Sequence, residues 1–189
     1  MNPLALYELA TTTLDCVCAA QDALQAELAV DGIRYGCACV SMVSPAPPVW
    51  DSCCDDCEGT GGQLTVHIAD VFASTKFPEP AQAVFPCAPV IWVAQLVVTS
   101  LRCIPSVSET GQAPSPEAIA ESARTVSIDT MAILQAVTCC LTEGNPPKRK
   151  RRVSVSSVNP TSGDDAGCTG VEVTILVEAG LCVDCVESS

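Results

Sequence analysis

The sequence contains few aromatic residues, little positive charge and almost no histidine. Of its 189 residues only 4% are aromatic, nine are Lys or Arg, and His67 is the one histidine. With a hydrophobic share of 48%, the core must therefore be filled by Ala, Val, Leu and Ile. A net charge of −13 argues against general binding to nucleic acid, because phosphate contacts need clustered Lys and Arg.

The sequence also lacks a long apolar run and a recognisable signal peptide. Its longest apolar stretch, residues 88–98, contains Pro89 and Gln95 and is too short to span a bilayer as a helix. At the N-terminus no basic stretch precedes the apolar residues, and Glu8 and Asp15 interrupt any signal core. We therefore expect a protein that is made in the cytoplasm and has no membrane contact.

Signatures of catalysis are absent from the sequence as well. There is no phosphate-binding glycine loop, paired-histidine metal motif or nucleophile elbow. Residues 59–62 are glycine-rich but precede a predicted strand instead of opening a helix. His67 falls in the middle of that strand, where a hydrogen-bonded or solvent-facing structural histidine is the ordinary finding. We expect no enzymatic activity and no cofactor.

Two segments have the apolar spacing of amphipathic helices. Residues 3–29 follow an N-cap at Asn2 and repeat apolar side chains every three, four or seven positions. A second helix starts at Ser115, which is followed by a proline and an early carboxylate, and stops at residues 144–147.

Four segments have the character of strands. Residues 33–43 predict an edge strand, and residues 63–73 alternate apolar and polar side chains. Residues 90–103 are apolar on both faces, which predicts a central strand that pairs antiparallel with the preceding one. Residues 171–177 predict a half-exposed strand near the end of the chain.

This order predicts an α+β fold. We expect a small antiparallel sheet with two helices packed on one face, in the order αβββαβ with room for one more strand at the end. The length suits a single domain, residues 1–180, with a loop insert at 44–62 and a basic loop at 145–167. Residues 181–189 form a C-terminal tail.

Cysteines are abundant, with fourteen in the chain. Two CxxC pairs, Cys54 with Cys57 and Cys182 with Cys185, could supply the four thiolates of a zinc site. The first pair lies in an acidic loop and the second in an apolar tail, so unrelated cysteines or disulfides explain them equally. Neither pair opens a helix after a strand, which argues against thioredoxin-like redox chemistry. We expect no bound metal, and mostly free thiols at synthesis.

The strongest local feature is a run of positive charge. Five of the nine basic residues are consecutive: Lys148, Arg149, Lys150, Arg151 and Arg152. Three interpretations fit such a run. It is a solvated loop, or it contacts DNA or an acidic neighbour, and a nuclear localisation signal is the weaker third interpretation. If several copies form a ring, these charges would converge where a passing DNA backbone feels their summed field.

Several uncommon segments occur together in this chain. They are Pro48-Val49-Trp50-Asp51-Ser52-Cys53-Cys54, Gly61-Gly62-Gln63-Leu64-Thr65-Val66, Phe77-Pro78, Cys87, Leu101-Arg102-Cys103, Cys139-Cys140 and Gly167-Cys168-Thr169-Gly170. In this combination, over roughly residues 4–180, the chain resembles the tail terminator and head-to-tail connector (neck) proteins of long-tailed actinobacteriophages. It departs from their pattern at residues 55–60, 148–152 and 181–189.

The resemblance implies a structural virion protein of the neck, assembled in the host cytoplasm. A tail terminator is a homo-oligomeric ring, commonly a hexamer, that caps the tail tube of major tail protein and joins it to the head-completion (stopper) protein. A stopper or adaptor protein of the neck is the alternative, since these are also small and form rings. A cysteine-stapled extracellular binding module and a zinc-dependent regulator are the remaining hypotheses.

Overall fold

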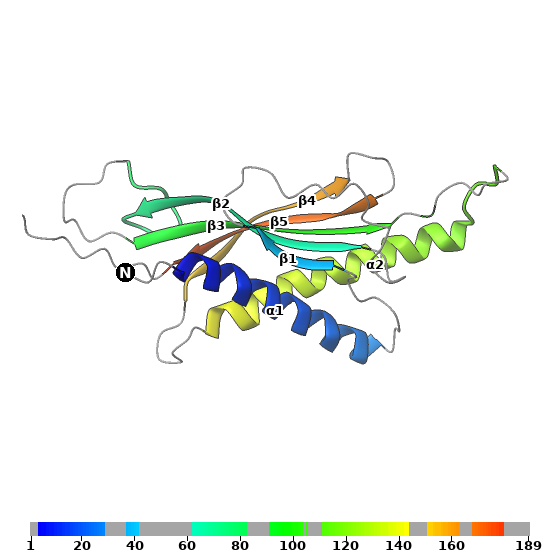
Figure 1. Ribbon diagram of the computed structural model, residues 1–189, viewed down its shortest axis with the longest axis horizontal. Helices are drawn as coiled ribbons and strands as arrows, with labels where there is room; N and C mark the ends of the chain where they lie inside the picture. Colours follow the sequence, from blue (N-terminus) through cyan, green and yellow to red (C-terminus); the bar gives the residue numbers. More distant parts are fainter. Residues whose placement is uncertain are drawn as a thin grey trace, which may run out of the picture.

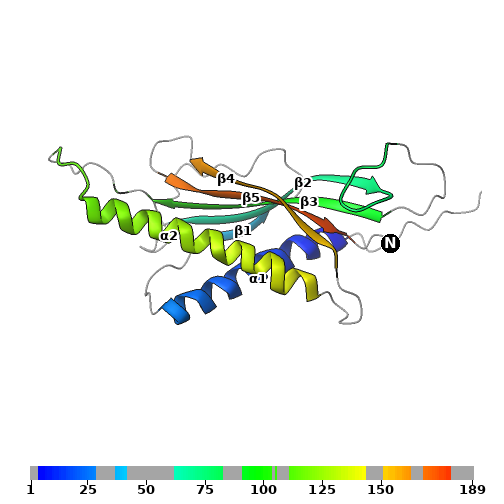
Figure 2. The same cartoon turned by 180° about the vertical axis from the view of Figure 1, so that it is seen from behind.

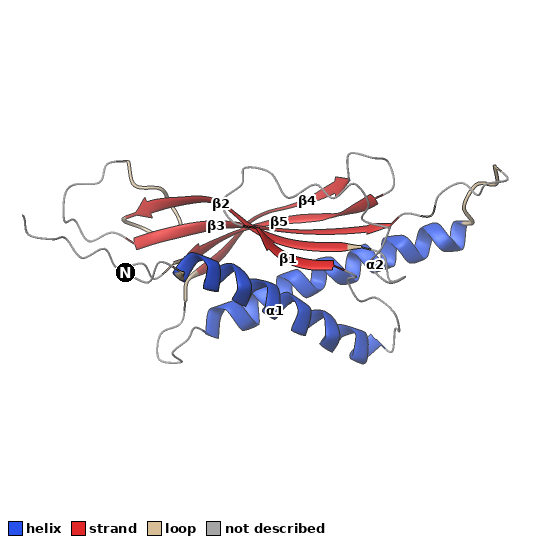
Figure 3. Ribbon diagram, in the orientation of Figure 1, coloured by secondary structure: helices blue, strands red, loops and turns tan. Residues whose placement is uncertain are grey.

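The computed structural model describes residues 4–28, 37–41, 62–82, 91–103, 105, 111–143, 151–162 and 168–179. In chain order the elements are α1 (Ala5–Leu28), β1 (Cys37–Ser41), β2 (Gln63–Ser74), β3 (Ile91–Cys103), α2 (Pro116–Gln135), β4 (Val153–Ser162) and β5 (Cys168–Glu178). Figure 1 and Figure 2 show both helices on the same side of the sheet, and Figure 3 shows the two layers by element type. The predicted α+β fold class is confirmed.

The strands form one sheet in the order β1-β2-β3-β5-β4. The pairs β2–β3, β3–β5 and β5–β4 are antiparallel, so the prediction that β3 is central and runs antiparallel to β2 is confirmed. The prediction of a wholly antiparallel sheet is wrong at one edge, because β1 pairs with β2 in parallel. Parallel neighbours need a connection of roughly a dozen residues or more, and residues 42–62 supply one.

One strand was missed by the sequence patterns. Residues 153–162 fall within the predicted basic loop 145–167, but they form β4 and pair with β5 along their whole length. A bulge between Val155 and Ser157 shifts the register, so the apolar residues of β4 do not keep a period of two. The bulge hid the strand, and the order is αβββαββ.

The predicted last strand is present as β5, with one face in the core and the other partly exposed. Val171, Val173, Ile175 and Val177 are buried, whereas Glu172 and Leu176 on the opposite face are intermediate in exposure. Thr174 and Glu178 on that face are each only 9% exposed, so the outer face is less exposed than predicted.

The core lies between the sheet and the two helices. Its buried members are aliphatic, and Trp92 packs against them only partly buried. The largest fully buried apolar side chains are Val17, Leu64, Val66, Ile68, Val93, Leu96, Val98, Ile133, Leu141, Val173 and Ile175. Within the described residues the core is therefore built as the scarcity of aromatics predicted.

Helix α2 begins at the predicted cap. The Ser115 hydroxyl accepts a hydrogen bond of 3.2 Å from the backbone N–H of Ala118, and Pro116 occupies the first helical position. After Gln135 the chain continues as a π-helical turn, Ala136–Cys140, and a 3₁₀ turn, Leu141–Glu143. The helical segment therefore runs up to the predicted stop at residue 144, although its last eight residues are not α-helical.

A disulfide joins the two helical segments. Cys16, buried in α1, is bonded to Cys140 in the π-helical turn, 124 residues later. Cys103 and Cys168 each form disulfides too, whereas Cys18 and Cys139 are free. The structure thus contains oxidised cysteines where we expected mostly free thiols at synthesis. The four cysteines of the CxxC pairs lie outside the described residues.

We expect the Cys16–Cys140 disulfide to stabilise the fold mainly by lowering the conformational entropy of the unfolded chain, which it closes into a loop. A closed loop of this length corresponds to roughly 4 to 5 kcal/mol in the chain-entropy estimate. Replacing both cysteines by alanine should lower the free energy of unfolding by a comparable amount in urea titrations without reductant. Cys139→Ala is the matched control, because Cys139 is exposed and unbonded. Equal midpoints for both variants would contradict the prediction.

Candidate functional site

A buried ion pair connects the sheet to α2. Asp129 on α2 has a fully buried side chain, and that of Arg102 on β3 is 6% exposed. Arg102 donates from Nε to Oδ2 of Asp129 at 2.7 Å and from Nη2 to Oδ1 at 2.8 Å. This two-pronged geometry matches a planar guanidinium to a planar carboxylate and is the strongest form of such a pair.

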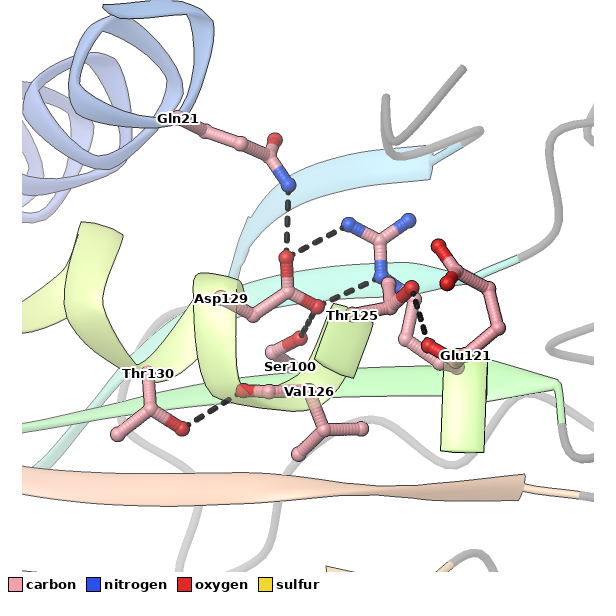
Figure 4. Close-up of polar contacts among 8 residues, drawn as sticks. Gln21, Ser100, Glu121, Thr125, Val126, Asp129 and Thr130 are labelled. Atoms are coloured by element: carbon pink, nitrogen blue, oxygen red, sulfur yellow. Dashed lines mark hydrogen bonds and ion pairs between the residues drawn. The ribbon is translucent and has the colours of Figure 1, made fainter. Parts of the chain in front are cut away.

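Two further donors complete the Asp129 site. Gln21 of α1 donates from Nε2 to Oδ1 at 2.8 Å, and the Ser100 hydroxyl of β3 donates to Oδ2 at 3.0 Å. Figure 4 shows Gln21 reaching Asp129 from α1. The four donors match the roughly four acceptor positions of a carboxylate. The Asp129 carboxylate therefore serves to join three elements and has no acceptor position left for a substrate.

Two glycines give this network its space. Gly62 has a φ of +120°, and a Cβ there would lie 2.8 Å from the Leu101 carbonyl oxygen and 3.0 Å from Cδ of Arg102. A Cβ on Gly170 of β5 would collide with the carbonyl group of Ser100. Glycine at both positions lets β3 and its polar side chains take their places.

The sequence analysis did not single out this network, although one signal for it existed. Asp129 lies on the apolar stripe of the second predicted helix, between Val126 and Ile133. A charge on a buried face requires a partner of opposite sign. Sequence alone gives no means of choosing Arg102, which lies 27 residues away on another element.

The predicted basic run is only partly described. Lys148, Arg149 and Lys150 lie outside the described residues, whereas Arg151 and Arg152 lead directly into β4. The Arg151 N–H donates to the Thr142 carbonyl at 3.3 Å. Burial lowers the pKa of the Arg151 guanidinium, and the charge of Glu178 opposes that shift. Arg151 is thus attached to the turn that follows α2.

Arg152 is held from three sides. Its Nε donates to Oε2 of Glu178 at 3.0 Å, and its carbonyl accepts from the Glu178 N–H at 2.9 Å. The guanidinium carbon also lies 5.6 Å from the centre of the Phe77 ring, within the range of a cation–π contact. The last two charges of the run therefore anchor the start of β4 to β5.

His67 is buried in β2, at 2% exposure, and so it is not the solvent-facing residue that was one of the two structural alternatives. It lies opposite Val97 on β3, and none of the described residues forms a hydrogen bond with its Nδ1 atom. Burial lowers the pKa of His67, while the charge of Glu172 raises it by a smaller amount. The buried imidazole is therefore held in its neutral form more strongly than an exposed one.

We expect the Asp129 network to be required for folding. Asp129→Asn leaves the Arg102 charge buried without a counter-charge, which costs roughly 3 to 5 kcal/mol. The double variant Arg102→Met, Asp129→Leu should recover most of that loss, because it removes both charges. Chemical denaturation of these variants measures the effect.

Glu121→Gln is the matched control for the Asp129 variants. Glu121 is an exposed carboxylate of the same helix, 3.8 Å from Arg124, and its loss should cost about 0.5 kcal/mol or less. If Asp129→Asn were as mild as this control, the buried pair would not be essential to the fold.

His67 should make stability depend on pH. Because the folded pKa lies below the unfolded value of about 6.5, lowering the pH through that value protonates the unfolded chain first. As the pH is lowered, the free energy of unfolding should therefore decrease, and this group should contribute at most about 1.4 kcal/mol per pH unit to the decrease. Between pH 7.5 and 5.5, His67→Gln should remove this contribution to the slope of unfolding free energy against pH. The contribution of the carboxylates is the same in both proteins and cancels in the comparison. Parallel slopes would refute the prediction.

The described residues offer anchoring contacts rather than a reactive centre. No group of three or more metal-ligating side chains converges within the described part of the chain. None of the described helices has an apolar stretch long enough to cross a membrane.

In comparisons with known proteins, no protein-family model matches the chain and no similar curated protein was found.

Proposed function

We propose that this chain is a structural virion protein, a tail terminator that forms a ring, caps the tail tube of a long-tailed phage and joins it to the head connector. The segments that resemble neck proteins support this proposal, and an α+β domain with two helices on one face of a sheet is compatible with it. On this proposal the protein is not an enzyme, and it acts by burying surface against its neighbours.

The observation that carries the proposal is the edge strand β4. It contains no charged residue over the whole of Val153–Ser162, in a chain of net charge −13. Val155 and Val158 on it are 38% and 43% exposed. An uncharged edge with exposed valines is available for pairing with another chain, while the bulge between Val155 and Ser157 and the proline at Pro160 limit that pairing to a short ladder.

A ring needs two different surfaces on each copy, and the sheet offers them. β4 forms one edge and β1 forms the other among the described strands. A contact between unlike surfaces closes into a ring when the rotation per copy divides a full turn. The two edges differ in sequence, which is what such a head-to-tail contact requires.

The helical side adds exposed apolar residues that fit further contacts. Leu4 and Tyr7 at the start of α1 are 58% and 48% exposed, and Ile119 and Met131 on α2 are each 55% exposed. Leu28 at the end of α1 is also 45% exposed. Single exposed apolar residues are common, but these residues together add to the surface available for the tail tube or the stopper protein.

The basic run fits a contact with DNA in the lumen of the ring. Arg151 and Arg152, the last two residues of the run, are anchored at the start of β4, so the run enters the described fold at a fixed point. Repetition around a ring would multiply their charge, and a passing DNA backbone would respond to it.

The test is to mix the purified protein with growing tubes of the major tail protein from the same phage. We expect electron microscopy to show rings at tube ends and the tubes to stop lengthening. Val158→Lys should abolish capping, because it places a charge on the β4 edge. Lys76→Glu, at a position 79% exposed in the turn after β2, is the control that should still cap.

Other outcomes discriminate between the candidates. A protein that ignores tubes but binds the head connector would be a stopper or adaptor instead of a terminator. A protein that binds neither would overturn a role in the neck. Capping by Val158→Lys would keep the terminator function but remove β4 as the surface that carries it.

A further inference from the structure

The Cys16–Cys140 disulfide joins a buried residue to an exposed one. Cys16 is 3% exposed and belongs to the core between the sheet and the helices. Cys140, the last residue of the π-helical turn, is exposed. Figure 1 and Figure 2 show this end of the α2 segment beside α1. A reagent in solution therefore meets the Cys140 half of the bond first.

We propose that Cys140 is a thiol-exchange site, at which a thiolate from another molecule bonds to the Cys140 sulfur and displaces Cys16. A disulfide is broken by attack of a thiolate on one of its two sulfurs, and access decides which sulfur is attacked. Core side chains surround Cys16, so the Cys16 sulfur is the leaving group. This inference goes beyond the proposed function and does not depend on it.

The exchange is balanced without an oxidant or a reductant. The incoming thiol gives its proton to water, and its sulfur forms a bond with Cys140 as the bond between Cys16 and Cys140 breaks. Cys16 leaves as a thiolate and takes up a proton. One disulfide and one thiol are present before and after, and the products are a mixed disulfide on an exposed residue and a thiol in the core.

The two free cysteines beside the bond are poorly placed to attack it within their own chain. Cys139 is exposed, but the Cα atoms of adjacent residues are about 3.8 Å apart, below the roughly 4.4 to 6.8 Å that disulfides span. Cys18 is two positions from Cys16, and such residues do not face each other on a helix. Burial raises the pKa of the Cys18 thiol, and two nearby aspartates add to this, so less thiolate forms. Of the thiols in the described part of the chain, none is therefore placed to attack, and the incoming thiol belongs to another molecule.

Two sources supply a thiol of the required chemistry. A small thiol such as glutathione needs only access to the exposed residue. Cys139 of a second copy is the other source, because each copy carries an exposed thiol next to the exchange site. From residue 125 to residue 142 the sole charged side chain is that of Asp129, which is buried, so charge repulsion between copies is weakest on this face. Both sources form the same bond to Cys140, and the masses of their products differ.

Exchange removes one of two polar or covalent ties between α1 and the α2 segment. The other is the 2.8 Å hydrogen bond from Gln21 to Asp129, which contains no sulfur. Val137 and Leu141, on either side of the bonded cysteine, are 2% and 1% exposed and still pack in the core. We therefore expect exchange to loosen the π-helical turn and to leave the sheet folded. Faster amide hydrogen exchange in residues 136–143, with β3 unchanged, measures this loosening.

The selectivity between the two sulfurs is the test. The oxidised full chain is incubated with glutathione, quenched with acid and mapped by peptide mass spectrometry. We expect loss of the linked Cys16–Cys140 peptide, matched by equal gains of glutathione on Cys140 and of free Cys16. The same reaction in urea is the matched control, because the unfolded chain exposes both sulfurs and should give adducts on each. A folded chain with the same split as the unfolded one, or one whose bond survives conditions that convert the unfolded chain, would overturn the proposal.

Cys139→Ser distinguishes the neighbouring cysteine from the exchange site and identifies the source of the thiol. The adduct should still form in this variant, and its loss would assign the adduct to Cys139 and refute exchange at Cys140. The natural chain is also concentrated without glutathione. Covalent dimers that contain a Cys139–Cys140 bond and are lost in Cys139→Ser identify a second copy as the source, whereas exchange with glutathione alone identifies a small thiol. None of these measurements depends on tube capping, so failure of the proposed function leaves this inference standing.

Discussion

The buried carboxylate of Asp129 on α2 needs hydrogen-bond donors, and the two elements packed beside it, α1 and β3, supply them. Gln21 fixes where α1 crosses, and Arg102 and Ser100 fix the end of β3 beneath α2. Because leaving a buried charge without its partners is strongly destabilising, these contacts favour this position of the two helices on the sheet. The glycines beside β3 are needed because that position brings backbones close together.

The same arrangement determines which surfaces are left for neighbours. Both helices pack on one face of the sheet, and β1 and β4 are its outer strands within the described part of the chain. Arg152 and Glu178 tie the start of β4 to β5, so this edge is presented by a firmly held strand. Because the start of this edge strand is anchored, it would present its backbone hydrogen-bonding groups to a pairing strand in one register.

The parts of the fold that could be predicted are those with a local signal. The alternation in β2, the doubly apolar β3 and the Ser115 cap of α2 each depend on a few adjacent residues. β4 could not be found this way because its bulge breaks the alternation, and the parallel pairing of β1 depends on a partner distant in sequence. Asp129 signalled that a buried partner exists, but Arg102 could be identified only in three dimensions. The proposed neck function comes from resemblance, to which the geometry adds only that β1 and β4 are the outer strands among those described.

The Cys16–Cys140 bond has a mechanical consequence. A pulling force applied between the two ends of the chain is transmitted through that bond and bypasses residues 17–139, because the two cysteines are 124 positions apart. At roughly 3.5 Å per extended residue, on the order of 400 Å of chain is withheld from stretching. The oxidised subunit could lengthen only outside this covalent loop, whereas the reduced subunit could be unravelled from end to end. In the proposed role at the neck of a phage, oxidation would set how far each copy can extend under load.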